Sequence, residues 1–269
     1  MSFVEITYPQ PQIALVSLNR PDRMNAMAFD VMQPLKEELE KLSFNAKVRV
    51  VVLTGKGTSF CAGADLQDPG YLDIFDGHTM PRIALRAMRV LDDVITTIRE
   101  MTQPVIAAIN GPAIGGGFCL AMAADIRVAS DTAIFRAAGI NNGLTSAELG
   151  LSYLLPRAIG ISRANEIMLT GRDVGAEEAE RIGLLSKVTS QEALLDESFK
   201  IAAMITRHSH LGVEQSKQIM NASLDAGSLH GHMHHEGITQ LFVRMTTKNF
   251  EEAIKARKEK RAPDFTDDI

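Results

Sequence analysis

Hydrophobic and polar residues follow two different periods along this chain. Alternation with a period of two over residues 3–8 and 13–18 predicts a β-hairpin with a loose turn. Apolar residues at helical spacing over 29–42 predict a helix. The uninterrupted apolar run over 48–53 predicts a strand that is buried on both faces, and therefore a sheet covered on both sides.

The same cycle then repeats. A helix over 83–99 is expected to precede strands at 105–109, 126–129 and 133–135. From residue 149 the pattern is helical and interrupted by glycine turns, apart from one short strand at 184–188. This order predicts a layered α/β core over residues 1–190 and a helical region over 191–269 that docks against it.

Composition excludes several classes of protein. The chain has 269 residues, 45% of them hydrophobic and 23% charged, which is typical of a globular protein. A net charge of −5 provides no general attraction for nucleic acid or an anionic membrane. Only Cys61 and Cys119 are available, too few for a disulfide framework. With no apolar run of about 18 residues and no signal-peptide pattern at the N-terminus, we expect a cytoplasmic protein without membrane or nucleic-acid partners.

Two of the predicted buried strands lead directly into segments rich in small residues. One segment spans 55–66, and the other spans 110–117 and ends in three consecutive glycines. Neither matches a phosphate-binding loop or a dinucleotide fingerprint. Backbone N–H groups at such ends, notably that of Gly116, can converge on one oxygen and form an oxyanion hole for the enolate of a thioester. The alternative is a tight turn that only requires small residues.

Four co-linear segments resemble the crotonase (enoyl-CoA hydratase/isomerase) superfamily. They are Asn19-Arg20-Pro21, the run from Phe60 to Leu66, the run from Asn110 to Gly117, and Glu259-Lys260-Arg261. The resemblance covers residues 4–265 and implies an α/β spiral of ββα units with a helical C-terminal trimerisation region. It also implies an acyl-CoA substrate and assembly as a homotrimer or a dimer of trimers. No metal and no cofactor are expected, because coenzyme A is part of the substrate.

The resemblance also assigns site residues by position. It implies that Ala64 and Gly116 donate the two oxyanion hydrogen bonds. It places the substrate and its coenzyme A against Arg23, Met24, Asn25, Ala26, Ala62, Asp65, Leu66 and Lys260. Asp65 is expected to be structural rather than catalytic. Lys260 belongs to a basic C-terminal helix that, in the family, approaches the CoA phosphates, sometimes those of a neighbouring subunit.

The acid positions depart from the hydratase pattern. Cys119 and Gly139 stand where hydratases of the family carry catalytic glutamates, and neither can deprotonate water. Glu148, eight residues before Pro156, matches the base of family isomerases. The resemblance thus favours a double-bond shift with Glu148 as base, at a pKa raised by apolar neighbours. Two alternatives for the protein remain: a hydratase with a rearranged acid set and a catalytically silent acyl-CoA binder. For Glu148 the alternative is an acid at a helix N-terminus that is favoured by the helix dipole.

Three further groups have competing interpretations. Cys119 has no histidine near it in sequence, so a small buried hydrophobe is preferred to a nucleophile. The acids Asp68, Asp73 and Asp76 lie in one loop and are either a source of a second catalytic acid or simply solvated. One predicted helix carries four histidines, which are interpreted as an exposed or intersubunit face rather than a metal site: His230, His232, His234 and His235.

Overall fold

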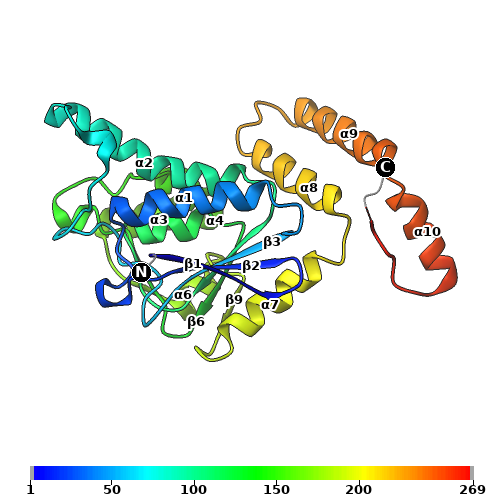
Figure 1. Ribbon diagram of the computed structural model, residues 1–269, viewed down its shortest axis with the longest axis horizontal. Coiled ribbons are helices and arrows are strands. Elements are labelled where there is room, and N and C mark those ends of the chain that lie inside the picture. The colour runs from blue at the N-terminus through cyan, green and yellow to red at the C-terminus, as the bar shows by residue number, and fades with distance from the viewer. Residues whose placement is uncertain (1–2, 267–269) are drawn as a thin grey trace.

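The computed structural model describes residues 3–266 and has a six-stranded sheet at its centre (Figure 1). The strand order is β1-β2-β3-β4-β6-β9. The strands are β1 (Val4–Gln10), β2 (Ile13–Leu18), β3 (Val50–Gly55), β4 (Val105–Ile109), β6 (Ile126–Ser130) and β9 (Lys187–Thr189). All neighbours are parallel except the predicted β1-β2 hairpin, whose turn is tighter than expected because Gln12 adopts a φ of 65°.

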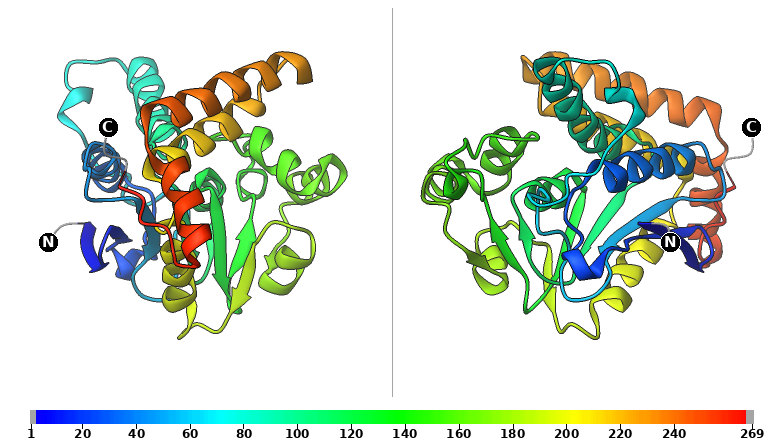
Figure 2. Two further views of the ribbon diagram at one scale, coloured as in Figure 1. Left: turned by 90° about the vertical axis from the view of Figure 1, so that its right-hand side faces the viewer. Right: turned by 60° about the vertical axis from the view of Figure 1, so that its left-hand side comes forward.

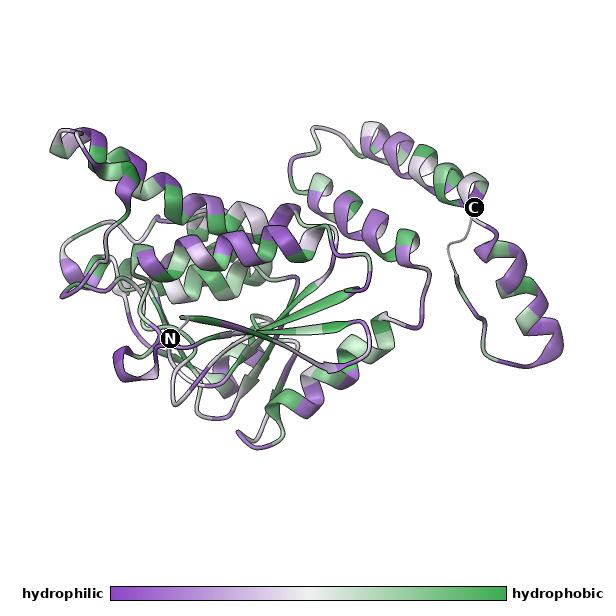
Figure 3. Ribbon diagram, viewed as in Figure 1, coloured by the Kyte–Doolittle hydropathy of each residue, from purple (hydrophilic) through white to green (hydrophobic). Residues whose placement is uncertain are grey.

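Alternate residues of β3 enter two different cores, as a strand buried on both faces requires. Val51 and Leu53 join the larger core, which is covered by α1 (Phe29–Ser43), α2 (Met80–Glu100) and α3 (Gly116–Ala123). Val50 and Val52 join a second core formed with α7 (Leu194–Ile205). Hydrophobic residues accordingly concentrate along the central strands, with helices on both sides (Figures 2 and 3). The predicted two-sided burial of the sheet is confirmed.

A smaller sheet and a group of short helices extend this core. The second sheet contains β5 (Ala113–Ile114), β7 (Ile134–Arg136) and β8 (Val174–Gly175). The sequence pattern missed β5 and β8 because a two-residue strand shows no alternation. The remaining elements of this part are α4 (Leu151–Ile159), α5 (Ile161–Thr170), α6 (Ala176–Arg181) and the 3-10 helices Pro21–Arg23, Asp73–Phe75 and Ile140–Asn142.

The C-terminal helices do not all dock against the core as predicted. Helix α8 (His210–Ser223) is anchored by Lys217, whose side chain is 3% exposed and donates to Ile98 O (3.0 Å) and Gln103 O (2.9 Å). Helices α9 (Leu229–Thr246) and α10 (Asn249–Glu259) instead project away from the sheet (Figure 1). Their exposed apolar side chains are Leu229, Met233, Ile238, Leu241, Phe242, Met245, Phe250 and Ile254. Within residues 3–266, no helix combines the length and apolar character needed to cross a bilayer.

Candidate active site

The two segments that follow β3 and β4 pair with each other, which brings distant parts of the sequence together. Cys61 and Ala113 form a parallel bridge in which Cys61 N–H donates to Pro112 O (3.1 Å) and Ile114 N–H donates to Cys61 O (3.0 Å). The backbones approach so closely that a β-carbon at Gly117 would lie 2.0 Å from Cys61 O. The glycine cluster therefore allows two loops to touch, and the segment does require small residues.

This pairing places Gly116 beside the segment that carries Ala64. A β-carbon on Gly63 would lie 3.5 Å from Gly116 N, so the two donor segments are immediate neighbours. Gly116 is the first residue of α3, where backbone N–H groups have no partner in the helix. Among residues 3–266, neither Gly116 N–H nor Ala64 N–H has a hydrogen-bond acceptor. Both remain available to a ligand oxygen.

Met27 holds both donor segments, although no sequence pattern singles it out. The N–H of Met27 donates to Gly63 O (2.7 Å), and its carbonyl accepts from Asp65 N–H (3.3 Å). Met27 is therefore hydrogen-bonded to the residues on both sides of Ala64. The N–H of Ala64 consequently points away from Met27. The Met27 sulfur packs on Gly116, since a β-carbon there would lie 2.3 Å from Sδ. An apolar residue has no chemical signature in sequence, and only its two contacts reveal this role.

Glu148 lies beside these donors. A β-carbon on Gly115 would stand 3.6 Å from Glu148 Oε1. Glu148 precedes α4 by three residues, with Leu149 in the left-handed region at φ 45°, so it is not part of the first helical turn. The side chain is half-buried without an ion pair among the described residues, and desolvation raises its pKa.

Cys119 occupies the adjoining position on α3. Its thiol lies 3.3 Å from Gly115 O and 3.5 Å from Glu148 O. Burial, and then the nearby charge of Glu148, raise the pKa of this thiol well above its usual value. Cys119 is therefore a neutral side chain at the site, as expected of a small buried hydrophobe rather than a nucleophile.

A cleft of about 320 Å³ next to Ala64 collects most of the residues assigned to coenzyme A. Its lining consists of Asp22, Arg23, Met24, Ala26, Ala62, Ala64, Asp65, Leu66 and Gln67. Asp65 forms ion pairs with Arg20 (3.0 Å) and Arg23 (2.6 Å), and the hydrogen bonds from Arg23 hold its pKa well below the usual range. Its carboxylate is occupied, so it shapes the loop.

Two of the assigned residues lie outside this cleft. Asn25 is fully buried and donates to Lys56 O (2.9 Å) and Ser59 O (2.8 Å), so it holds the loops together instead of lining the cleft. Lys260 caps the C-terminal end of α10. This helix and the start of β1 lie on opposite sides of the core (Figure 1). A single chain therefore does not bring Lys260 to the cleft.

The remaining candidate groups are dispersed. Asp68 pairs with Arg20 (3.0 Å), Asp76 accepts from the Tyr71 hydroxyl, and Asp73 is exposed. The four histidines lie on α9. Among the described residues, no three His, Cys, Asp or Glu side chains are grouped so that they could hold a metal ion.

Several known proteins are similar to this chain over most of its length. A family model described as enoyl-CoA hydratase/isomerase matches residues 9–268. A probable enoyl-CoA hydratase, EchA12 of Mycobacterium tuberculosis, is 61% identical over 268 residues, covering 100% of this chain and 94% of the relative.

Two solved structures are similar as well. A probable enoyl-CoA hydratase/isomerase from Mycobacterium abscessus has a TM-score of 0.95 at 59% identity and covers 100% of both chains. A monofunctional enoyl-CoA isomerase from M. smegmatis has a TM-score of 0.75 at 52% identity, covering 87% of this chain and 99% of its own. The α/β fold expected from the sequence is confirmed by these neighbours.

Proposed function

The chain belongs to the enoyl-CoA hydratase/isomerase family, and within it we propose that this protein moves the double bond of an enoyl-CoA with Glu148 as its base. The observation that carries the proposal is a carboxylate beside two N–H groups that have no acceptor within residues 3–266, with Cys119 and Gly139 at the hydratase acid positions. A β-carbon at Gly139 would lie 2.0 Å from Thr145 O, so the backbone itself prevents a side chain there.

The proposed reaction needs one base and two donors. The N–H groups of Ala64 and Gly116 bind the thioester oxygen and stabilise the dienolate that forms when C2 loses a proton. Glu148 accepts that proton and returns it to C4, which converts a 3-enoyl-CoA into a 2-enoyl-CoA. One carboxylate is sufficient because both carbons are close together on one face of the substrate. We assign the nucleotide part of coenzyme A to the cleft that Arg23 and Ala62 line.

Assays of the purified protein with both substrates test this proposal. We expect 3-enoyl-CoA to be isomerised and 2-enoyl-CoA to be hydrated poorly, because Glu148 has no second carboxylate as a partner in the proposed site. The relative at 61% identity is named a probable hydratase, which makes hydration the competing function. Efficient hydration without isomerisation would contradict the proposal. Absence of proton exchange at C2 would instead indicate an acyl-CoA binder without catalytic activity.

The pH dependence of the isomerisation reports on the proposed base. Only ionised Glu148 accepts a proton, and burial raises its pKa, so kcat/KM should fall with decreasing pH at a midpoint above the ordinary glutamate range. The measurement is kcat/KM from about pH 4 to pH 8, with circular dichroism as a control for folding. Asp65 stays ionised throughout because Arg23 lowers its pKa. A midpoint at or below the ordinary glutamate value would argue against this base.

We further propose that the protein assembles as a homotrimer or a dimer of trimers. The apolar side chains of α9 and α10 support this assembly, because they are exposed in a single chain and would be covered by neighbouring subunits. In such an assembly, Lys260 of one subunit could also approach the cleft of another.

Sedimentation equilibrium at micromolar concentration should give three or six times 29.3 kDa. Leu241→Glu on α9 should lower that mass, whereas Met204→Glu, equally exposed at 61% on α7, should not. A monomeric wild type would refute the assembly.

A further inference from the structure

Three arginines line a cleft between α4, α8 and the start of β6, away from the residues assigned to catalysis. The cleft has a volume of about 260 Å³. Arg99 enters it from the end of α2, Arg127 from β6 and Arg157 from α4. The only carboxylate in its lining belongs to Asp125.

Asp125 is already occupied by other partners. Its carboxylate lies 2.9 Å from the ammonium of Lys217, whose side chain is only 3% exposed. It also accepts a hydrogen bond from Val105 N–H at 2.7 Å. Arg99 is 3.9 Å away, at the limit of an ion pair. Two cations, Lys217 and Arg99, therefore already share this carboxylate before Arg127 and Arg157 are considered.

Arg127 and Arg157 have no carboxylate within ion-pair distance among the described residues. Arg127 donates to Leu184 O (2.9 Å) and Ala124 O (2.7 Å), which leaves Nη2 without an acceptor in residues 3–266. Arg157 donates to Tyr153 O (2.9 Å) and stacks on that ring, 3.5 Å from its centroid. Both guanidinium groups keep donors available.

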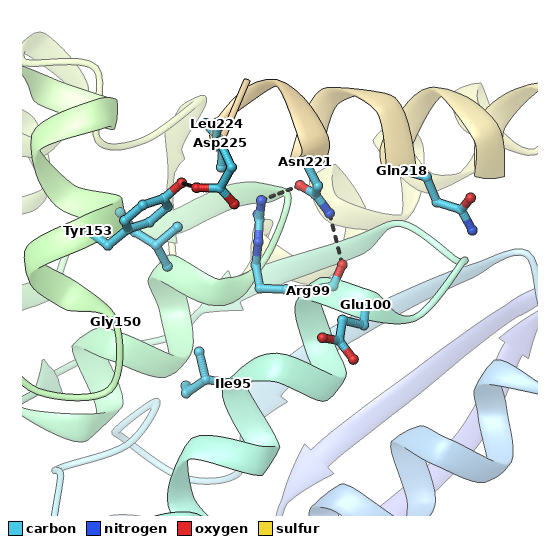
Figure 4. Close-up of a pocket in the computed structure, with 10 residues that line it drawn as sticks. Ile95, Arg99, Glu100, Gly150, Tyr153, Gln218, Asn221, Leu224 and Asp225 are labelled. Atoms are coloured by element: carbon cyan, nitrogen blue, oxygen red, sulfur yellow. Dashed lines mark hydrogen bonds between the residues drawn. The ribbon is translucent and has the colours of Figure 1, made fainter. Parts of the chain in front are cut away.

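The acids nearby face a different space. Glu100 and Asp225 line an adjoining, larger cavity of about 450 Å³, which shares Arg99 and Asn221 with the arginine cleft (Figure 4). Asp225 accepts from the Tyr153 hydroxyl, and Arg99 donates to Asn221 (Figure 4). Neither acid lines the arginine cleft, and among the described residues neither forms an ion pair with Arg99, Arg127 or Arg157.

Three guanidinium groups and one carboxylate line this cleft, an arrangement that favours a bound anion. Burial lowers the pKa of Arg127, attraction to the Asp125 carboxylate raises it, and the smaller repulsion from Arg99 lowers it. Planar guanidinium groups bind phosphate or carboxylate oxygens through paired hydrogen bonds. An oxyanion between them would offset the repulsion and connect the three elements.

We propose that the arginine cleft is a second binding site, separate from catalysis, for a small free oxyanion such as phosphate or a carboxylate. The bound anion ties α4 to the end of α2 and to β6. Because α4 begins three residues after Glu148, the anion also steadies the element next to the base. This site does not depend on the proposed isomerase reaction, and binding measurements alone test it.

Thermal unfolding in phosphate provides the first test. At about 10 mM sodium phosphate and a Kd on the order of 1 mM, Tm should rise by about 3 °C relative to sodium chloride of equal ionic strength. Arg157→Gln and Arg99→Met should each weaken phosphate binding in calorimetry by about tenfold or more, because each removes a charge-assisted contact. Arg157 is exposed, so its variant is expected to fold even if the Arg99 variant does not.

Arg163→Gln is the matched control, since Arg163 is an exposed arginine on α5 outside the cleft. Malonate in place of phosphate distinguishes a carboxylate ligand from a phosphate ligand, and binding of either supports the site. Equal Tm values in phosphate, malonate and chloride would overturn it, as would an equal loss of binding in Arg163→Gln. A change of oligomeric mass in Arg157→Gln without anion binding to the wild type would show that a second copy's acid fills the cleft, which also overturns the proposal.

Discussion

Replacing Glu148 by glutamine is expected to abolish isomerisation while leaving substrate binding almost unchanged. Glutamine has nearly the same shape but cannot accept a proton, and no second carboxylate is proposed to replace it. We expect kcat for 3-enoyl-CoA to fall by about 10³- to 10⁴-fold, with KM changed by less than about threefold. Steady-state kinetics with the purified variant measure both quantities.

Two controls make this result specific. Glu177→Gln removes an exposed acid on α6 and should leave kcat unaltered. Since burial raises the pKa of Glu148, its ionised form opposes folding above that pKa, and the free energy of unfolding of Glu148→Gln at pH 7 should equal or exceed that of the wild type. Full activity in Glu148→Gln would transfer the role of base to another acid, with the loop that carries Asp68, Asp73 and Asp76 the next candidate.

Gly116→Pro should produce the second largest loss. Proline removes the N–H of Gly116 from the proposed oxyanion hole, yet it is well tolerated as the first residue of a helix. Loss of one such donor costs about 3 kcal/mol in the transition state, which corresponds to a decrease in kcat of about 10²-fold. Stopped-flow or steady-state isomerisation assays measure this decrease directly.

The necessary comparison is Gly116→Ala, which retains the N–H. Both substitutions introduce a β-carbon 2.3 Å from Met27 Sδ, so both disturb the packing. Making each change in a Met27→Ala background removes that collision, and the proline variant should still be the slower of the two by about 10²-fold. If proline and alanine variants had equal kcat in this background, the N–H of Gly116 would have no part in catalysis.

Local patterns were sufficient for most of the secondary structure. The five apolar positions of the first predicted helix, Val31, Met32, Leu35, Leu39 and Leu42, are all buried on α1. The run around Val50 forms a strand with cores on both faces, as its composition indicated. These predictions succeed because burial on one face of a helix, or on both faces of a strand, leaves a periodic record in neighbouring residues.

The pattern was less informative where structure depends on distant partners. The helical region over 191–269 was predicted to dock against the core, but no residue of α9 is buried in this chain. Amphipathic periodicity shows that a helix has an apolar face, and it does not show what covers that face. Asn25 was similarly assigned to ligand binding by position, whereas its amide is satisfied by Lys56 and Ser59.

The sequence by itself determined the family, the order of the longer strands and helices, and the candidate donors, because each is recorded in contiguous residues. Only the tertiary structure decided that Met27 touches both donor segments and that Arg99, Arg127 and Arg157 line one cleft. Met27 meets the donor segments because the loops that follow β3 and β4 lie at the same edge of the parallel sheet and pair there, whereas the three arginines come from α2, β6 and α4. The hydrogen bonds of Met27 and the clustering of the three arginines depend on distances in space. Periodicity along a chain does not encode such distances.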